Sequence, residues 1–70
     1  MNHEHIINSL IDARKKKKMT QEELAQCTEV SRQTIISIEK GNYTPSVLLA
    51  IKIAQTLSMN VEDIFTLKKP

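Results

Sequence analysis

Residues 20–41 read TQEELAQCTEVSRQTIISIEKG and contain two short segments with the residue pattern of helices. The first begins with Thr20-x-x-Glu23, a capping box that commonly starts a helix. Ser31 is a good N-cap for the second, because apolar residues follow it at helical spacing. The stretch therefore predicts two helices joined by a turn of about three or four residues, at 20–27 and 31–39.

Further helix-start signals follow this pair. Thr44-Pro45 or Ser46 opens the next helix, and Asn60-x-x-Asp63 resembles another N-cap. With the apolar periodicity near the amino terminus, these signals predict five helices, at 6–17, 20–27, 31–39, 46–57 and 60–65. We expect one all-α domain over residues 1–70, a compact five-helix bundle with an ordered core at about 6–66.

Length and charge restrict the function. A chain of 70 residues buries only about 60% of its unfolded surface, which favours dimerisation and leaves little room for a catalytic cavity. Ten Lys and Arg outnumber eight Asp and Glu, and their clustering favours a polyanionic partner. No amino-terminal apolar run is long enough for a signal peptide or a membrane span, so the expected location is the cytoplasm.

The helix predicted at 31–39 has two different sides at about 100° per residue. The side expected to face the core carries Thr34, Ile35 and Ile38. The outer side carries Arg32, Gln33, Ile36, Ser37 and Lys40. Arginine suits guanine O6 and N7, glutamine suits adenine N6 and N7, and an exposed apolar group suits a thymine methyl. One interpretation is that this side reads base edges in a major groove; the other is an ordinary solvated helix face.

Several stretches together resemble the Xre/Cro-type helix-turn-helix regulators, including short stand-alone dimeric repressors such as the cytolysin repressor. The matching stretches are TQEELA (20–25), VSRQTI (30–35), IEKG (38–41), PS (45–46) and LAIKIA (49–54). They occur in the order and spacing of that family, and the similarity extends over roughly residues 6–66. The resemblance implies a DNA-binding helix-turn-helix formed by the second and third helices.

The resemblance also implies DNA contacts for individual residues. Base contacts are expected from Arg32, Gln33 and Ser37, and our hypothesis adds Ile36 as a thymine-methyl contact. Gln21 is expected to meet a phosphate at a helix N-terminus, where free N–H groups and the dipole favour an anion, although helix capping is its alternative role. The other DNA-backbone contacts are expected from Ser31, Lys40, Asn42, Tyr43 and Thr44. A purely conformational role in the turn remains open for Asn42.

Two further features concern the stability of the bundle. Arg14 falls in the middle of the apolar face of the first predicted helix, where an unpaired guanidinium is costly. The family resemblance pairs this position with Glu39 in a salt bridge. In the turn, the family commonly has an apolar residue where this chain has Thr28, and glycine where it has Glu29. Glu29 therefore implies either a strained left-handed residue or a slightly different turn.

The carboxyl-terminal part of the chain carries a surplus of apolar residues. The helix predicted at 46–57 is apolar nearly all round, with Val47, Ala50, Ile51, Ala54 and Leu57 expected to share one face. A homodimer interface is expected from Leu48, Ile64, Phe65 and Leu67. The alternative is that these residues only close the core. Similar stand-alone repressors carry a short pair of terminal strands, and the sequence leaves open whether this chain does.

These observations predict a sequence-specific double-stranded DNA-binding transcriptional regulator, a repressor that binds a two-fold-related operator as a homodimer. The alternative is an antitoxin-like protein-interaction module. No nucleophile–base constellation or phosphate-cradling glycine loop is present, so an enzyme is not expected. No cofactor, metal or small-molecule ligand is expected either, because His3-Glu4-His5 at the chain end is not a preorganised metal site.

Overall fold

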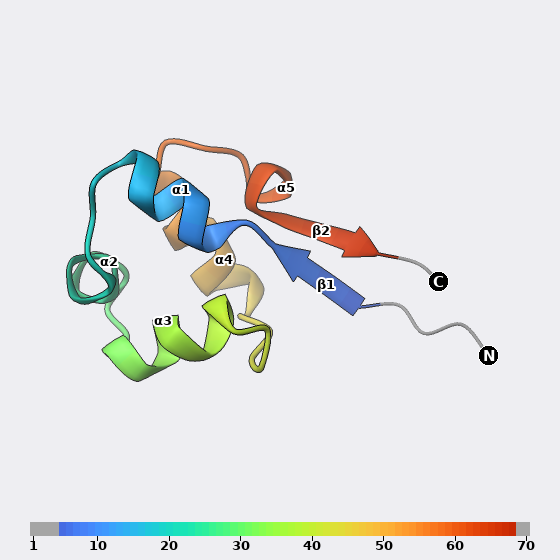
Figure 1. Cartoon of the computed structure of the whole chain (residues 1–70), viewed down its shortest axis with the longest axis horizontal. Coiled ribbons are helices and arrows are strands. Elements are labelled where there is room, and N and C mark those ends of the chain that lie inside the picture. The colour runs from blue at the N-terminus through green and yellow to red at the C-terminus, as the bar shows by residue number, and fades with distance from the viewer. Residues whose placement is uncertain (1–4, 69–70) are drawn as a thin grey trace.

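The computed structural model describes residues 5–68, so His3 and Glu4 lie outside the described part. Its elements follow the order β1 (His5–Asn8), α1 (Leu10–Lys16), α2 (Gln21–Thr28), α3 (Arg32–Glu39), α4 (Val47–Thr56), α5 (Val61–Ile64) and β2 (Phe65–Lys68). The helices surround one core, and the two strands project from it side by side (Figure 1). The domain is thus mostly helical, with α2 and α3 as the helix-turn-helix and one small antiparallel sheet.

Hydrogen-bonded caps begin four of the helices. The Thr20 hydroxyl accepts the Glu23 N–H at 3.0 Å, and the Glu23 carboxylate accepts the Thr20 N–H at 2.8 Å. Ser31 and Ser46 each accept a backbone N–H at 3.1 Å, and the Asn60 N–H donates to the Asp63 carboxylate at 3.1 Å. Each such cap stabilises its helix by about 1 kcal/mol. The starts of α2, α3, α4 and α5 therefore lie where the sequence predicts them.

The first element differs from the prediction, because residues 5–8 form a strand and α1 begins only at Leu10. Ile6 pairs with Leu67 and Ile7 with Thr66 in antiparallel register. From local sequence alone, Ile6 and Ile7 fit a helical pattern as well as a strand. The residues that pair with them lie at the other end of the chain, so the local pattern does not reveal the strand. The terminal strand pair that the sequence left open is thus present. Ile7 lies on the sheet and is exposed.

The core is built from all five helices. Its buried members are Leu10, Ala13, Leu24, Ala25, Ile35, Ile38, Leu49, Ile53, Ala54, Leu57 and Ile64. Of the residues expected to share one face of α4, Ala50, Ala54 and Leu57 are buried, whereas Val47 is 76% exposed and Ile51 is also exposed. Leu49 and Ile53 complete the buried face. Because α4 is apolar nearly all round, its own sequence does not select the face that packs inward.

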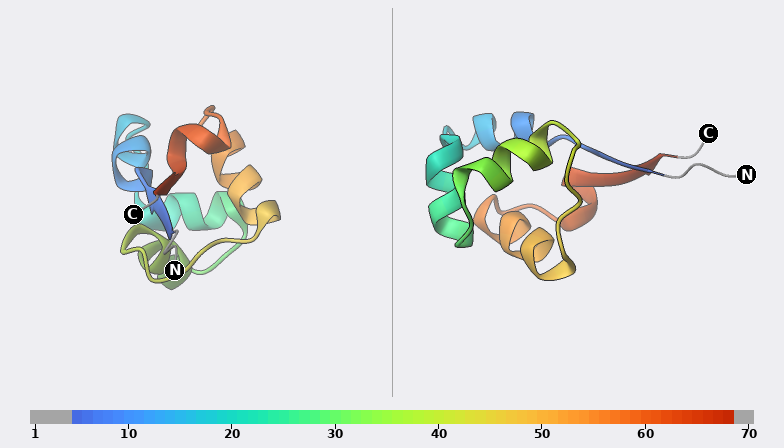
Figure 2. Two further views of the ribbon diagram at one scale, coloured as in Figure 1. Left: turned by 90° about the vertical axis from the view of Figure 1, so that its right-hand side faces the viewer. Right: turned by 90° about the horizontal axis from the view of Figure 1, so that it is seen from below.

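The sheet extends the molecule in one direction. The molecule measures 39 × 21 × 20 Å, and the sheet points away from the helices (Figure 2). An isolated two-stranded ribbon is marginally stable in water. Here the Ser9 N–H donates to the Ile64 carbonyl at 2.9 Å, and the Ser9 hydroxyl donates to the Asp63 carbonyl at 3.1 Å. These bonds attach the base of the sheet to α1 and α5.

The turn between α2 and α3 contains the left-handed residue that the sequence offered as one of two alternatives. Glu29 has φ 63° and ψ 39°, and its N–H donates to the last carbonyls of α2. Its carboxylate accepts a hydrogen bond from Lys52 Nζ at 3.0 Å, and this bond and the Lys52 charge hold the pKa of Glu29 below its ordinary value. Thr28 is buried, and its hydroxyl donates to the Leu24 carbonyl at 2.8 Å. The glycine conformation is therefore retained without glycine.

Candidate nucleic-acid interface

Helix α3 has one buried and one exposed side. Ile35 and Ile38 are fully buried, and their packing fixes α3 against the core. Arg32 and Gln33 are exposed, whereas Ile36 and Ser37 are partly exposed. All four side chains proposed to read bases therefore reach the surface, and neither Arg32 nor Gln33 enters the hydrophobic interior. Thr34, expected on the core side, is half-buried.

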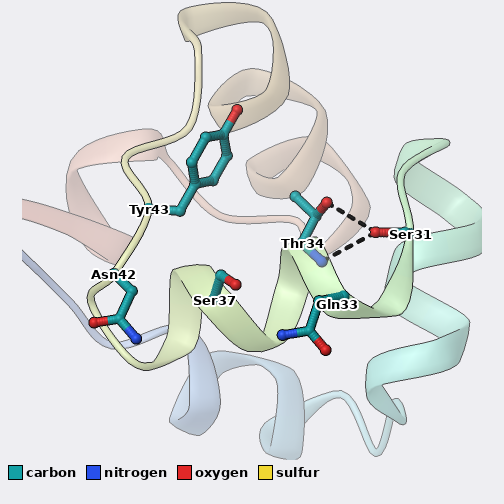
Figure 3. Close-up of a pocket in the computed structure, with 6 residues that line it drawn as sticks. All are labelled: Ser31, Gln33, Thr34, Ser37, Asn42 and Tyr43. Carbon is teal, nitrogen blue, oxygen red and sulfur yellow. Dashed lines mark hydrogen bonds between the residues drawn. The ribbon is translucent and has the colours of Figure 1, made fainter.

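One flank of α3 borders a shallow depression of about 300 Å³. Its lining residues are Ser31, Gln33, Thr34, Ser37, Asn42 and Tyr43. Figure 3 shows Gln33, Ser37 and Asn42 along one side of α3, with the Ser37 hydroxyl between the two amides. Amide and hydroxyl groups can donate hydrogen bonds to phosphates, and they can donate to or accept from base edges. The depression thus joins the proposed base-reading residues to the proposed backbone-contacting ones.

The residues proposed for DNA-backbone contacts lie at both ends of α3. Ser31 caps its amino end, while Lys40, Asn42, Tyr43 and Thr44 follow its carboxyl end. All five are exposed. The left-handed residue of this loop is Gly41, with φ 79°, so the turn does not require Asn42 for its conformation. The Asn42 N–H donates to the Ser37 carbonyl at 2.9 Å, which holds Asn42 close to the helix end.

The other flank of α3 is held by an ion pair between Arg14 and Glu39. Arg14 Nε donates to Glu39 Oε2 at 2.7 Å, and Arg14 Nη2 lies 3.4 Å from Glu39 Oε1. Arg14 Nη1 donates to the Met19 carbonyl at 2.8 Å. The Arg14 side chain is 11% exposed and that of Glu39 is 3% exposed. The pair therefore joins α1 to α3 away from solvent, where a single unpaired charge is costly.

Gln21 connects this ion pair to the exposed surface. Its Nε2 donates to Glu39 Oε1 at 2.9 Å, and its Oε1 accepts from Arg32 Nη2 at 3.3 Å. The Gln21 amide therefore has a defined orientation, with one N–H left over for another acceptor. No local sequence pattern indicates these side-chain contacts, because they join residues that only the packing of α2 against α3 brings together.

The residues expected at a dimer interface differ in exposure. Leu48 is 66% exposed and Leu67 is 53% exposed, whereas Phe65 is half-buried. Ile64 is fully buried within the chain, so its side chain belongs to the core and offers no area to a partner. This is a correction to the expected interface, and its cause is that the short helix α5 turns Ile64 inward. Leu48, Phe65 and Leu67 remain as proposed contacts.

A helix-turn-helix family model matches residues 10–64. The chain belongs to the Xre/Cro-type helix-turn-helix family. It is therefore a DNA-binding transcriptional regulator of that family and not an enzyme. Between residues 5 and 68, no helix is long and apolar enough to cross a membrane.

Relatives of this helix-turn-helix regulator occur in bacteria and archaea. The HTH-type regulator YgzD of Bacillus subtilis, itself uncharacterized, is 50% identical over 50 residues, which are 71% of this chain and 76% of YgzD. The uncharacterized HTH-type regulator MJ0272 of Methanocaldococcus jannaschii is 60% identical over 47 residues, which are 67% of this chain and 71% of the relative. Both similarities extend over two thirds or more of each chain.

Solved structures share the fold of this helix-turn-helix regulator. The restriction-modification controller protein C.AhdI from Aeromonas hydrophila matches with a TM-score of 0.73 and 26% identity, over 77% of this chain and 82% of C.AhdI. The clp gene regulator ClgR from Corynebacterium glutamicum matches with a TM-score of 0.74 and 30% identity, over 77% of this chain and 57% of ClgR. The match to C.AhdI thus includes most of both chains.

Proposed function

We propose that this regulator is a repressor that binds a two-fold-related operator in double-stranded DNA as a homodimer in the cytoplasm. The observation that carries the proposal is the exposed outer side of α3, with Arg32 and Gln33 at its amino end and Lys40 at its carboxyl end. This arrangement suits a helix lying in a major groove, with its exposed side toward the bases and the flanking Ser31 and Lys40 toward phosphates. A dimer seated on promoter DNA represses by excluding the polymerase.

The proposed base contacts are tested by comparing Arg32→Ala with Gln21→Ala. The operator is first located by footprinting the DNA around the gene of this protein with increasing protein concentration. Loss of the Arg32 guanidinium is expected to relax discrimination at one base pair by about 1–3 kcal/mol. Loss of the Gln21 amide is expected to weaken related sites more uniformly, because its proposed contact is a phosphate. Affinities measured on operator variants and on random DNA separate the two effects.

Gln26→Ala is the control for this comparison, because Gln26 is another glutamine of α2, is exposed and has no proposed DNA contact. Equal losses on operator and random DNA for Arg32→Ala contradict its role in reading bases. No retention on any DNA, together with co-purification of a small protein, supports an antitoxin-like interaction module instead.

The proposed dimer is tested at Leu48. Its exposed side chain on α4, with Leu67 on β2, supplies apolar surface for a second copy. Helix-turn-helix dimers place their two reading helices about 34 Å apart, so operator affinity requires both protomers. Leu48→Lys is expected to shift the molecule to the monomer in sedimentation experiments and to remove the two-fold footprint. Ile11→Lys on α1, another exposed apolar position, is expected to leave the dimer intact; a dimer that survives Leu48→Lys contradicts the proposed interface.

A further inference from the structure

Asn8 lies where the sheet, α1 and the carboxyl end of α3 meet. Its Nδ2 donates to the Ile38 carbonyl at 2.9 Å, and its Oδ1 accepts the Leu10 N–H at 3.2 Å. Its backbone is paired with Phe65 in the sheet. The Asn8 side chain therefore joins the start of α1 to the carboxyl end of α3, while its backbone belongs to the sheet.

The bond from Asn8 to Ile38 matters because of where α3 ends. The last carbonyls of a helix have no partner within the helix, so an external donor both satisfies and fixes them. The Ile38 carbonyl also accepts the Gly41 N–H at 2.9 Å, at the start of the loop that carries Asn42. The Ile38 side chain is buried in the core. Asn8 therefore holds the carboxyl end of α3 and the base of the following loop.

The two ends of α3 are held by different parts of the chain. At the amino end, the exposed Arg32 is bonded to Gln21, and Ser31 caps the helix. At the carboxyl end, Glu39 is bonded to Arg14 of α1, and Asn8 ties the Ile38 carbonyl to the end of β1. Of these bonds, the one from Asn8 links α3 to the terminal sheet. Asn8 thus connects the carboxyl end of α3 to the strand that pairs with β2.

We propose that Asn8 is a positioning residue for operator recognition, which fixes the carboxyl end of α3 to the terminal sheet. The base contacts proposed for Gln33 and Ser37 depend on the angle of α3, because major-groove hydrogen bonds require defined geometry. Contacts to random DNA depend mainly on charge, which a small rotation of α3 leaves unchanged. The inference rests on the proposed function, and its signature is a loss of specificity in a folded protein.

Three substitutions isolate the bond to α3. Asn8→Asp has the same shape and keeps the acceptor for the Leu10 N–H, but it replaces the donor with an oxygen that faces the Ile38 carbonyl. Asn8→Ser removes the donor to the Ile38 carbonyl without adding charge. The shorter serine hydroxyl can still accept the Leu10 N–H, but it does not reach the Ile38 carbonyl. Ser9→Ala is the matched control, because it removes the neighbouring bond to the Asp63 carbonyl and leaves α3 untouched.

Affinities are measured for the operator and for random DNA at a temperature where circular dichroism shows each protein folded. Asn8→Ser and Asn8→Asp are expected to lower the ratio of operator to random affinity by about tenfold, the effect of one base contact. Ser9→Ala is expected to keep the wild-type ratio. If Asn8→Asp does not fold, the affinity ratio of Asn8→Ser alone tests the proposal. An unchanged ratio for folded Asn8→Ser overturns the proposal.

A second readout needs no DNA. Asn8→Ser is expected to shift the amide resonances of residues 36–42, whereas Ser9→Ala leaves them near their wild-type positions. Unshifted resonances in Asn8→Ser overturn the role of Asn8 even if no operator is found. If wild-type protein does not distinguish operator from random DNA, the proposed function fails, and the resonances still test the coupling of β1 to α3.

Discussion

Glu39→Gln is expected to lower the free energy of unfolding by about 3–5 kcal/mol, because it leaves the buried Arg14 guanidinium without its counter-charge. The Glu39 carboxylate accepts hydrogen bonds from both Arg14 and Gln21, and its side chain is only 3% exposed. A neutral amide places an N–H against one of these donors. For a domain of this size each kcal/mol shifts the melting temperature by about 4–8 °C, so thermal melts and urea titrations detect the change directly.

Two controls define this prediction. Glu22→Gln changes an exposed carboxylate in the first turn of α2 and is expected to cost less than about 1 kcal/mol. The double substitution Arg14→Met with Glu39→Leu removes both charges and is expected to recover most of the loss, since apolar replacement of a whole buried pair is often neutral. An unchanged melting temperature for Glu39→Gln shows that the ion pair does not hold α1 against α3.

The starts of α2, α3 and α4 were predictable because their signals are local. Thr20, Ser31 and Ser46 each bond to a backbone N–H three residues later, so the sequence around each cap contains both partners. The buried isoleucines of α3 follow from helical spacing for the same reason. Features set within about four residues are therefore accessible without coordinates.

The sequence placed residues 6–8 in a helix and grouped the exposed Val47 and Ile51 with residues of α4 that are buried, because distant residues determine both features. Ile6 and Ile7 are in a strand because Leu67 and Thr66 pair with them, and nothing near residue 6 encodes that partner. A local signal was nevertheless present: the polar pair Asn8-Ser9 separates the strand from Leu10 and marks the later helix start. In α4 the polar residues Lys52, Gln55 and Thr56 mark one side only in the second half of the helix, so the neighbouring helices decide which apolar residues are buried.

The candidate site also contains some features that local sequence predicts and others that only tertiary packing determines. The exposure of Arg32 and Gln33 follows from their place on α3, opposite the buried isoleucines. The link from Glu39 through Gln21 to Arg32 depends on the angle between α2 and α3, which is a property of the packed core. Asn8 likewise contacts Ile38 across 30 residues of sequence, so no local pattern encodes the bond. Residues that position a site are thus harder to find from sequence than residues that face solvent.

Operator binding is expected to weaken steeply with salt, and Lys40 is expected to contribute a defined part of that dependence. Lys40 is exposed at the carboxyl end of α3. Neutralising one phosphate contributes about −0.9 to the slope of log affinity against log salt. Lys40→Ala therefore makes the slope shallower by about 0.9 for each protomer, or about 1.8 for the proposed dimer. The slope is measured from operator affinities between about 50 and 200 mM salt.

Lys52→Ala is the matched control, because Lys52 Nζ already lies 3.0 Å from the Glu29 carboxylate and its proposed role is structural. Both substitutions remove one positive charge, so long-range attraction of DNA changes equally and only a direct phosphate contact distinguishes them. Because phosphate contacts carry no sequence information, Lys40→Ala is expected to reduce operator and random affinities by the same factor. Equal slopes for Lys40→Ala and Lys52→Ala mean that the carboxyl end of α3 does not touch the DNA backbone, and that the orientation proposed for α3 in the major groove is incorrect.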